Sequence, residues 1–160
     1  MSGETDLRAL LAGMKPTLRP EVYVFWTLPP DATLPAGVVP FATVREDEGL
    51  TVVIERQLTW EPADDDAYRA ITLGVHSSLN AVGFIAAVSR ALADAGIPAN
   101  VIAGYHHDHL LVPAAHAEHA MTILRELARS NSTPAAPAST TAFGNTHARS
   151  SSRKAPRKAP

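Results

Sequence analysis

The sequence contains no cysteine among its 160 residues. This absence excludes disulfide bonds, thiolate catalysis and cysteine-based metal sites, and it is compatible with a reducing cytosol. No apolar run approaches the roughly 20 residues that cross a bilayer, so we expect no membrane contact. The first six residues hold two acids and no basic residue, the opposite of a secretory signal. We therefore expect a cytoplasmic protein.

Aromatic residues are scarce, at 6%, but 46% of the residues are apolar. That is enough for the core of one ordinary domain, or of two very small ones packed together. The net charge of −2 conceals two segments of opposite sign. Residues 1–130 hold nine basic and sixteen acidic residues, whereas residues 131–160 hold five basic residues and no acid.

The second segment is rich in Ser, Thr, Ala and Pro and lacks periodic apolar positions. This composition predicts a disordered basic tail over residues 131–160. Five charges without aromatic residues cannot read a nucleic-acid sequence. We therefore favour a solubilising tail over a nucleic-acid contact.

The apolar pattern of residues 1–130 predicts both helices and strands. A first helix, capped by Thr5 or Asp6 and ended by Pro16, precedes strands over residues 21–28, 41–45 and 50–56. The second part has the order β-α-β-β-α. Its elements are a strand over 70–75, a helix that starts after Ser78 and closes at Gly96, strands over 100–104 and 109–112, and a helix over 117–128.

The order of the second part is that of a ferredoxin-like half-sheet that lacks its fourth strand. The strands of residues 21–56 are available to complete it. We therefore predict an α+β fold with antiparallel sheets and helices on one face, built from two intimately packed halves over residues 1–66 and 67–130.

Several ordered motifs resemble the small stand-alone bacterial ACT-domain proteins. They are ITLGVHSSLNAVG (71–83), GIPANVIAGYHHDHLLVP (96–113), LLAGMKP (10–16), YVF (23–25) and REDEGLT (45–51). The match covers about residues 6–128. The resemblance implies two tandem ACT-like units of βαββαβ type, related to the regulatory domains of aspartate kinases and to the cytosolic arginine sensors of animals.

In such proteins amino acids bind between ACT units, near the first strand-to-helix loop and an opposing strand. The resemblance therefore implies a non-catalytic amino-acid sensor. Two residues depart from the family pattern, because Phe84 replaces a smaller apolar residue and His106 replaces an aromatic one. If the pocket runs close to either residue, the ligand would differ in size from those of other family members.

The candidate ligand-binding residues lie in the loop after the fourth strand and in an acidic turn. In the loop, one of Ser77 and Ser78 is expected to cap the helix, and the unpaired amides that follow suit a carboxylate. The acidic turn would bind the ligand's ammonium group if it packs against this loop. The alternatives are that the serines only cap the helix and that the acids only form a solvated turn. The full set is His76, Ser77, Ser78, Leu79, Asn80, Ala81, Val82, Gly83, Glu46, Glu48 and Gly49.

The sequence also offers candidates for metal binding and for hydrolysis. His107, Asp108 and His109 are metal-ligand types, but neighbouring residues on a strand point to opposite faces. We therefore predict no metal and no cofactor. No Gly-x-Ser-x-Gly motif accompanies Ser77 or Ser78, so a serine hydrolase is disfavoured, and a metal-dependent hydrolase that uses the histidine cluster ranks as the third hypothesis. The main alternative to a sensor is an ACT-type interaction module without ligand. In either case, exposed sheet edges predict a homodimer.

Overall fold

The computed structural model describes residues 3–56 and 67–132. Its strands are β1 (Thr17–Leu28), β2 (Ala42–Glu46), β3 (Gly49–Glu55), β4 (Tyr68–Thr72), β5 (Asn100–Ala103) and β6 (Asp108–Pro113). Its helices are α1 (Leu7–Gly13), α2 (Phe84–Asp94), the short 3-10 helix η2 (Ala114–His116) and α3 (Ala117–Ser132). Residues 57–66 and the predicted tail beyond residue 132 lie outside the described residues.

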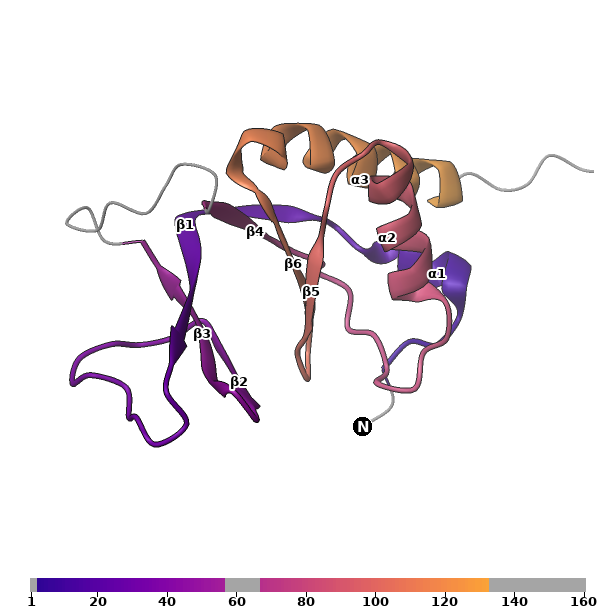
Figure 1. The fold of residues 1–160 in the computed structure, drawn as a ribbon. Helices are drawn as coiled ribbons and strands as arrows, with labels where there is room; N and C mark the ends of the chain where they lie inside the picture. The colour runs from indigo at the N-terminus through magenta and orange to yellow at the C-terminus, as the bar shows by residue number, and fades with distance from the viewer. Residues whose placement is uncertain (1–2, 57–66, 133–160) are drawn as a thin grey trace, which may run out of the picture.

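The strands form one antiparallel sheet in the order β2-β3-β1-β4-β6-β5 (Figure 1). Within it, β4, α2, β5, β6 and α3 make the predicted ferredoxin-like half. Its missing fourth position, beside β4, is filled by β1. The same strand pairs with β3 along Tyr23–Leu28, so β1 belongs to both halves of the sheet.

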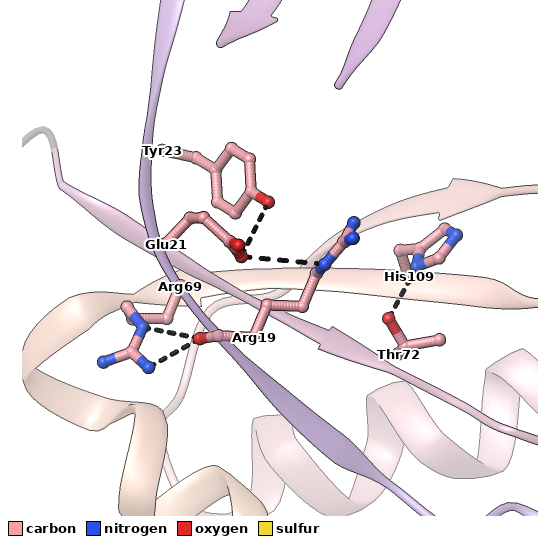
Figure 2. Close-up of polar contacts among 6 residues, drawn as sticks. All are labelled: Arg19, Glu21, Tyr23, Arg69, Thr72 and His109. Atoms are coloured by element: carbon pink, nitrogen blue, oxygen red, sulfur yellow. Dashed lines mark hydrogen bonds and ion pairs between the residues drawn. The ribbon is translucent and has the colours of Figure 1, made fainter. Parts of the chain in front are cut away.

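A bulge in β1 separates its pairing at Leu18 from its pairing at Val22. There the guanidinium of Arg69 donates two hydrogen bonds to the carbonyl of Arg19, at 3.1 Å from Nε and 2.6 Å from Nη2 (Figure 2). These bonds tie the Arg69 side chain of β4 to the β1 backbone where the ladder is irregular.

Three helices cover one face of the sheet, as predicted (Figure 1). The core beneath them takes residues from both halves of the chain, including Leu10 and Met14 with Ile71, Leu92 and Leu124, all of them fully buried. Burial of such side chains is the main favourable term in folding. The two halves therefore share a core and are intimately packed.

Two smaller clusters bury the rest of the sheet. Val24, Val52 and Ile54 pack beneath the loop that follows β1, against Leu34 and Val38. On the sheet face away from the helices, a third cluster groups four buried residues with partly buried aromatic neighbours. Its buried members are Tyr23, Val53, Ala70 and Leu111, and the neighbours include Phe41 and Tyr68.

Several predicted boundaries were wrong. The largest error concerns α2, which begins at Phe84 instead of directly after Ser78. Gly83, with φ of +90°, turns the chain into the helix, and residues 79–82 form a loop. β1 starts four residues earlier than predicted, and α3 continues to Ser132, two residues into the predicted tail. Asp6 caps α1 as predicted, because its Oδ1 accepts a hydrogen bond from the Ala9 amide at 2.8 Å.

None of the helices in the described parts of the chain is both long and apolar enough to cross a membrane.

Candidate functional site

The candidate site is built around the loop that joins β4 to α2. A bridge with the N-terminal segment fixes the middle of this loop: the Glu4 amide donates to the His76 carbonyl at 3.0 Å, and the Ser78 amide donates to the Glu4 carbonyl at 2.9 Å. On the other side, His107 Nδ1 lies 3.3 Å from the Val75 carbonyl. The N-terminus and the β5–β6 turn therefore both hold the loop.

A cavity of about 180 Å³ opens between this loop and the start of α2. Five of the predicted ligand-binding residues line it, namely Ser77, Ser78, Leu79, Ala81 and Gly83. The remaining walls come from Phe84, Ile85, Ala86, Ala103 and Asp108. Phe84, one of the two departures from the family pattern, therefore does lie at the pocket.

The start of α2 gives this cavity a polar edge. Gly83 provides no side-chain cap, and the first helical hydrogen bond runs from the Ala87 amide to the Gly83 carbonyl at 2.9 Å. The amides of residues 84–86 therefore have no acceptor within the helix, at the positive end of its dipole. The sequence assigned this role to residues 79–81, which lie in the loop instead.

Neither serine caps α2, contrary to the prediction. The Ser78 hydroxyl accepts a hydrogen bond from the Asn80 amide at 3.2 Å, which stabilises the turn within the loop. The Ser77 hydroxyl donates to Asp108 Oδ2 at 3.0 Å. Ser77 therefore links the loop to β6 through a residue that also lines the cavity.

Asp108 lines the candidate cavity, whereas the sequence interpretation placed it only among the metal-ligand candidates. Its side chain is buried, with 6% of its surface exposed, and it lines the cavity. The sequence carried a signal for this, because residues 108, 110 and 112 of β6 share one face and the last two are core residues. The two-residue period of the strand thus places a carboxylate on the core-facing side.

A second cavity, of about 170 Å³, adjoins the first. The two share Ser77, Ser78 and Leu79 as a common wall. Gly3, His76, Asn80 and Tyr105 complete the second cavity. The His106 ring packs edge-on against those of His76 and Tyr105, with centroids 5.4 Å and 5.0 Å away.

Four of the predicted residues do not join these cavities. Val82 is 85% exposed and lines neither. Glu46, Glu48 and Gly49 lie at the turn between β2 and β3, which Figure 1 shows apart from the loop before α2. The Glu46 carboxylate accepts a hydrogen bond from the Thr51 hydroxyl. In the described residues, no hydrogen bond or ion pair joins this turn to the loop, so the condition for its role in ammonium binding is not met within one chain.

The three metal-ligand candidates have separate partners. Asp108 contacts Ser77 on the helix-covered face, whereas His109 Nδ1 lies 3.0 Å from the Thr72 hydroxyl on the other face (Figure 2). His107 faces the Val75 carbonyl. Over residues 3–56 and 67–132, no group of three or more His, Asp or Glu side chains converges as a metal site would require.

A polar cluster lies on the sheet face away from the helices, at the bulge in β1 (Figure 2). Arg19 packs over the Phe41 ring at 5.3 Å and approaches Glu21 at 3.8 Å. Burial, followed by the nearby charges of Arg19 and His107, lowers the pKa of His109, against a raising effect of Asp108. Burial is also the main cause that raises the pKa of Tyr23, with Arg19 opposing it and Glu21 adding to it.

Comparisons with known proteins agree with this architecture. Sequence models of the ACT domain match residues 2–64 and residues 65–126. No curated protein matches the chain. A solved structure from Vibrio cholerae, described as a protein of unknown function and possible transport protein, is 43% identical to the chain. It has a TM-score of 0.65, and the alignment covers 76% of this chain and 95% of the other.

Two more distant structures share the fold. A protein from Agrobacterium tumefaciens is 19% identical, with a TM-score of 0.57 over 71% of this chain and 87% of the other. The regulatory subunit of aspartate kinase from Thermus flavus is 11% identical, with a TM-score of 0.51 over 70% of this chain and 95% of the other.

Proposed function

Because this chain belongs to the ACT-domain family, we propose that it is a regulatory protein that binds an amino acid without transforming it. The observation that carries the proposal is the cavity between the β4–α2 loop and α2, which five of the predicted ligand-binding residues line. Small-molecule sites are concave and mostly apolar, with a few polar groups placed to orient the ligand. The cavity has this character.

In this proposal the ligand's carboxylate lies at the first turn of α2. Phe84, Ile85 and Ala86 line the cavity, and their amides have no acceptor within the helix. A helix start of this kind favours a negative group. Glu46, Glu48 and Gly49 stay outside the proposed pocket of a single chain.

The absence of catalysis is part of the proposal. A serine hydrolase needs a histidine within hydrogen-bond reach of its nucleophile. Ser77 donates its hydroxyl to Asp108, and among the described residues no histidine nitrogen hydrogen-bonds to Ser77 or Ser78. This arrangement stabilises the loop and does not activate an oxygen.

Regulation would act through the elements that hold the loop. Glu4 ties it to the N-terminal segment, and the β5–β6 turn ties it to the second half. A ligand that binds one arrangement of these contacts more tightly than another shifts the population between them. β2 and β5 are the outermost strands of the sheet in the described residues, so we extend the proposal to a cytoplasmic homodimer paired along an edge.

An interaction module without ligand is the second candidate. Leu79 and Val82 are 67% and 85% exposed on the same loop. Neighbouring exposed apolar side chains are common at protein contacts. In that case the loop would bind a partner protein, and no amino acid would stabilise the chain.

A thermal-shift screen of the full chain against the proteinogenic amino acids at millimolar concentration separates the two candidates. A ligand at 100 times its Kd adds about 2.7 kcal/mol of stability, which raises the melting temperature by about 5–10 °C in a domain of this size. Ala86→Leu, which places bulk at the cavity rim, should abolish the shift. Ala93→Leu, at another exposed position of α2, should preserve it. A screen without any hit rejects the sensor.

A further inference from the structure

The carboxylate of Asp108 is buried beside the cavity without a cation. Its side chain is 6% exposed, the only charged side chain among the described residues that is buried. Ser77 donates one hydrogen bond to Oδ2, at 3.0 Å. In residues 3–56 and 67–132, no other donor reaches the carboxylate and no Lys, Arg or His pairs with it.

Hydrogen bonds within the described residues satisfy only part of this carboxylate. A buried charge is normally paired and hydrogen-bonded, because removing it from water costs several kcal/mol otherwise. An ionised carboxylate has room for about four hydrogen bonds, and the Ser77 hydroxyl supplies one. Asp108 lines the cavity, and no buried side-chain oxygen of the described residues lacks a hydrogen bond. The carboxylate oxygen that Ser77 leaves free is therefore solvent-accessible and available to a ligand.

We propose that Asp108 is the counter-ion for the ligand's ammonium group and that the cavity selects amino acids with short, uncharged side chains. The inference rests on the proposed function and assigns the ligand's polar groups within it. The ammonium lies at Asp108, and the carboxylate lies at the start of α2. Asp108 thereby takes the role that the sequence gave to the acidic turn.

The size and walls of the cavity limit the ligand's side chain. Its volume is about 180 Å³, below the roughly 300–1,000 Å³ of sites for drug-sized ligands. An engineered cavity of about 150 Å³ holds one benzene molecule, and alanine has as many non-hydrogen atoms as benzene. Ala81, Phe84 and Ala103 offer no charge to a side chain, and Phe84 is fixed in the core at 2% exposure. An acidic side chain would also be repelled by Asp108.

Ser77 is the positioning residue for this carboxylate. Its hydroxyl donates a hydrogen bond to Oδ2, which restricts the rotation of this carboxylate at the start of β6. Loss of the hydroxyl would leave the charge in place but free the side chain to rotate. Ser77→Ala should therefore weaken amino-acid binding less than Asp108→Asn, which keeps the shape and removes the charge.

Calorimetric titration of the full chain tests the assignment with two probes, L-alanine and L-lactate, which differ by an ammonium group in place of a hydroxyl. A charge-assisted hydrogen bond to Asp108 should make alanine bind about 10- to 100-fold more tightly than lactate. In Asp108→Asn this ratio should fall to near one, while Ser77→Ala should give an intermediate ratio. The ratio reports the charge specifically, because a general loss of structure would weaken both probes.

The outcomes separate this inference from the proposed function. Equal binding of alanine and lactate to the native chain, or an unchanged ratio in Asp108→Asn, overturns the role of Asp108 while leaving an amino-acid site in place. A larger or acidic amino acid that binds more tightly than alanine overturns the size selection. If no amino acid binds, the proposed function and the inference both fail. Should Asp108→Asn not fold, the alanine–lactate comparison on the native chain still decides the matter.

Discussion

At the level of single residues, His109 shows how the two halves of the chain touch on the open face of the sheet. Its ring lies edge-on to Phe41, with centroids 5.2 Å apart, and Nδ1 lies 3.0 Å from the Thr72 hydroxyl. Phe41 also contacts Tyr23 and Arg19. A half-buried imidazole therefore faces a guanidinium and an aromatic edge, and its charged form is disfavoured there.

This environment predicts a loss of stability in mild acid. The folded pKa of His109 lies below its ordinary value of 6.5, so the unfolded chain takes up the proton first as the pH falls. The free energy of unfolding should therefore decrease below about pH 6.5, until folded His109 is protonated as well. Denaturant titrations between pH 5 and pH 8, about one and a half units to either side of that value, should show a weaker decrease in His109→Gln.

His119→Gln, at an exposed position of α3, is the matched control and should retain the native decrease. The same pH dependence in the native chain and in His109→Gln would contradict the account of this residue.

The three acidic candidates show which part of the site the sequence could reveal. Asp108 lies two residues before Leu110 on a strand, so strand periodicity alone places it on the core-facing side. The role assigned to Glu46 and Glu48 required knowledge of where a distant turn packs. That is a matter of tertiary packing, and local residue patterns carry no information about it.

Among the elements, α2 shows why a helix start is hard to place. Ser77 and Ser78 are good capping residues ahead of an apolar periodic run, so the pattern favoured a start there. The backbone instead turns at Gly83, whose φ of +90° is one that residues with a Cβ rarely adopt. Gly83 was itself a signal for the later start. The two serines outweighed it in the prediction because serine is the more common capping residue.

Gly83→Ala should destabilise the protein by about 1–2 kcal/mol, because a Cβ makes the left-handed conformation unfavourable. Steric overlap contributes little, since the new Cβ would lie 3.5 Å from Leu7 Cδ2, an ordinary contact. Gly13→Ala is the matched control. Gly13 ends α1 without a positive φ, and its Cβ would lie 3.6 Å from Val75 Cγ2.

The control should leave stability unchanged or raise it by up to about 1 kcal/mol, because alanine is the better helix former. The measurement is urea unfolding of both variants beside the native chain. An unchanged midpoint for Gly83→Ala would show that the chain can enter α2 without the left-handed glycine.

For the whole molecule, the central feature is a strand shared between two halves. β1 pairs with β3 on one side and β4 on the other. The sequence predicted that residues 21–56 would complete the second half's sheet, because the β-α-β-β-α order lacks one strand. It did not reveal that one strand, the 12-residue β1, completes that sheet alone. Pro20 within the bulge made the start of that strand resemble a loop.

The core that the two halves share also connects the candidate site to the first half of the chain. Leu10, Leu11 and Met14 of the first half pack with Leu73 and Phe84, which flank the loop of the candidate site. Because Phe84 also lines the cavity, a ligand there contacts a residue on which both halves pack. This continuous packing is the physical route by which ligand binding in the cavity would affect the rest of the chain.

Amide chemical-shift mapping of the full chain, titrated with L-alanine, shows whether the cavity before α2 binds an amino acid. We expect progressive shifts at the amides of the residues that line the cavity, namely residues 77–79, 81, 83–86, 103 and 108. We also expect smaller shifts at Glu4, which is bonded to the loop. A titration that leaves these amides unmoved, or that shifts only amides elsewhere in the sheet, would contradict the claim that this cavity is a ligand site.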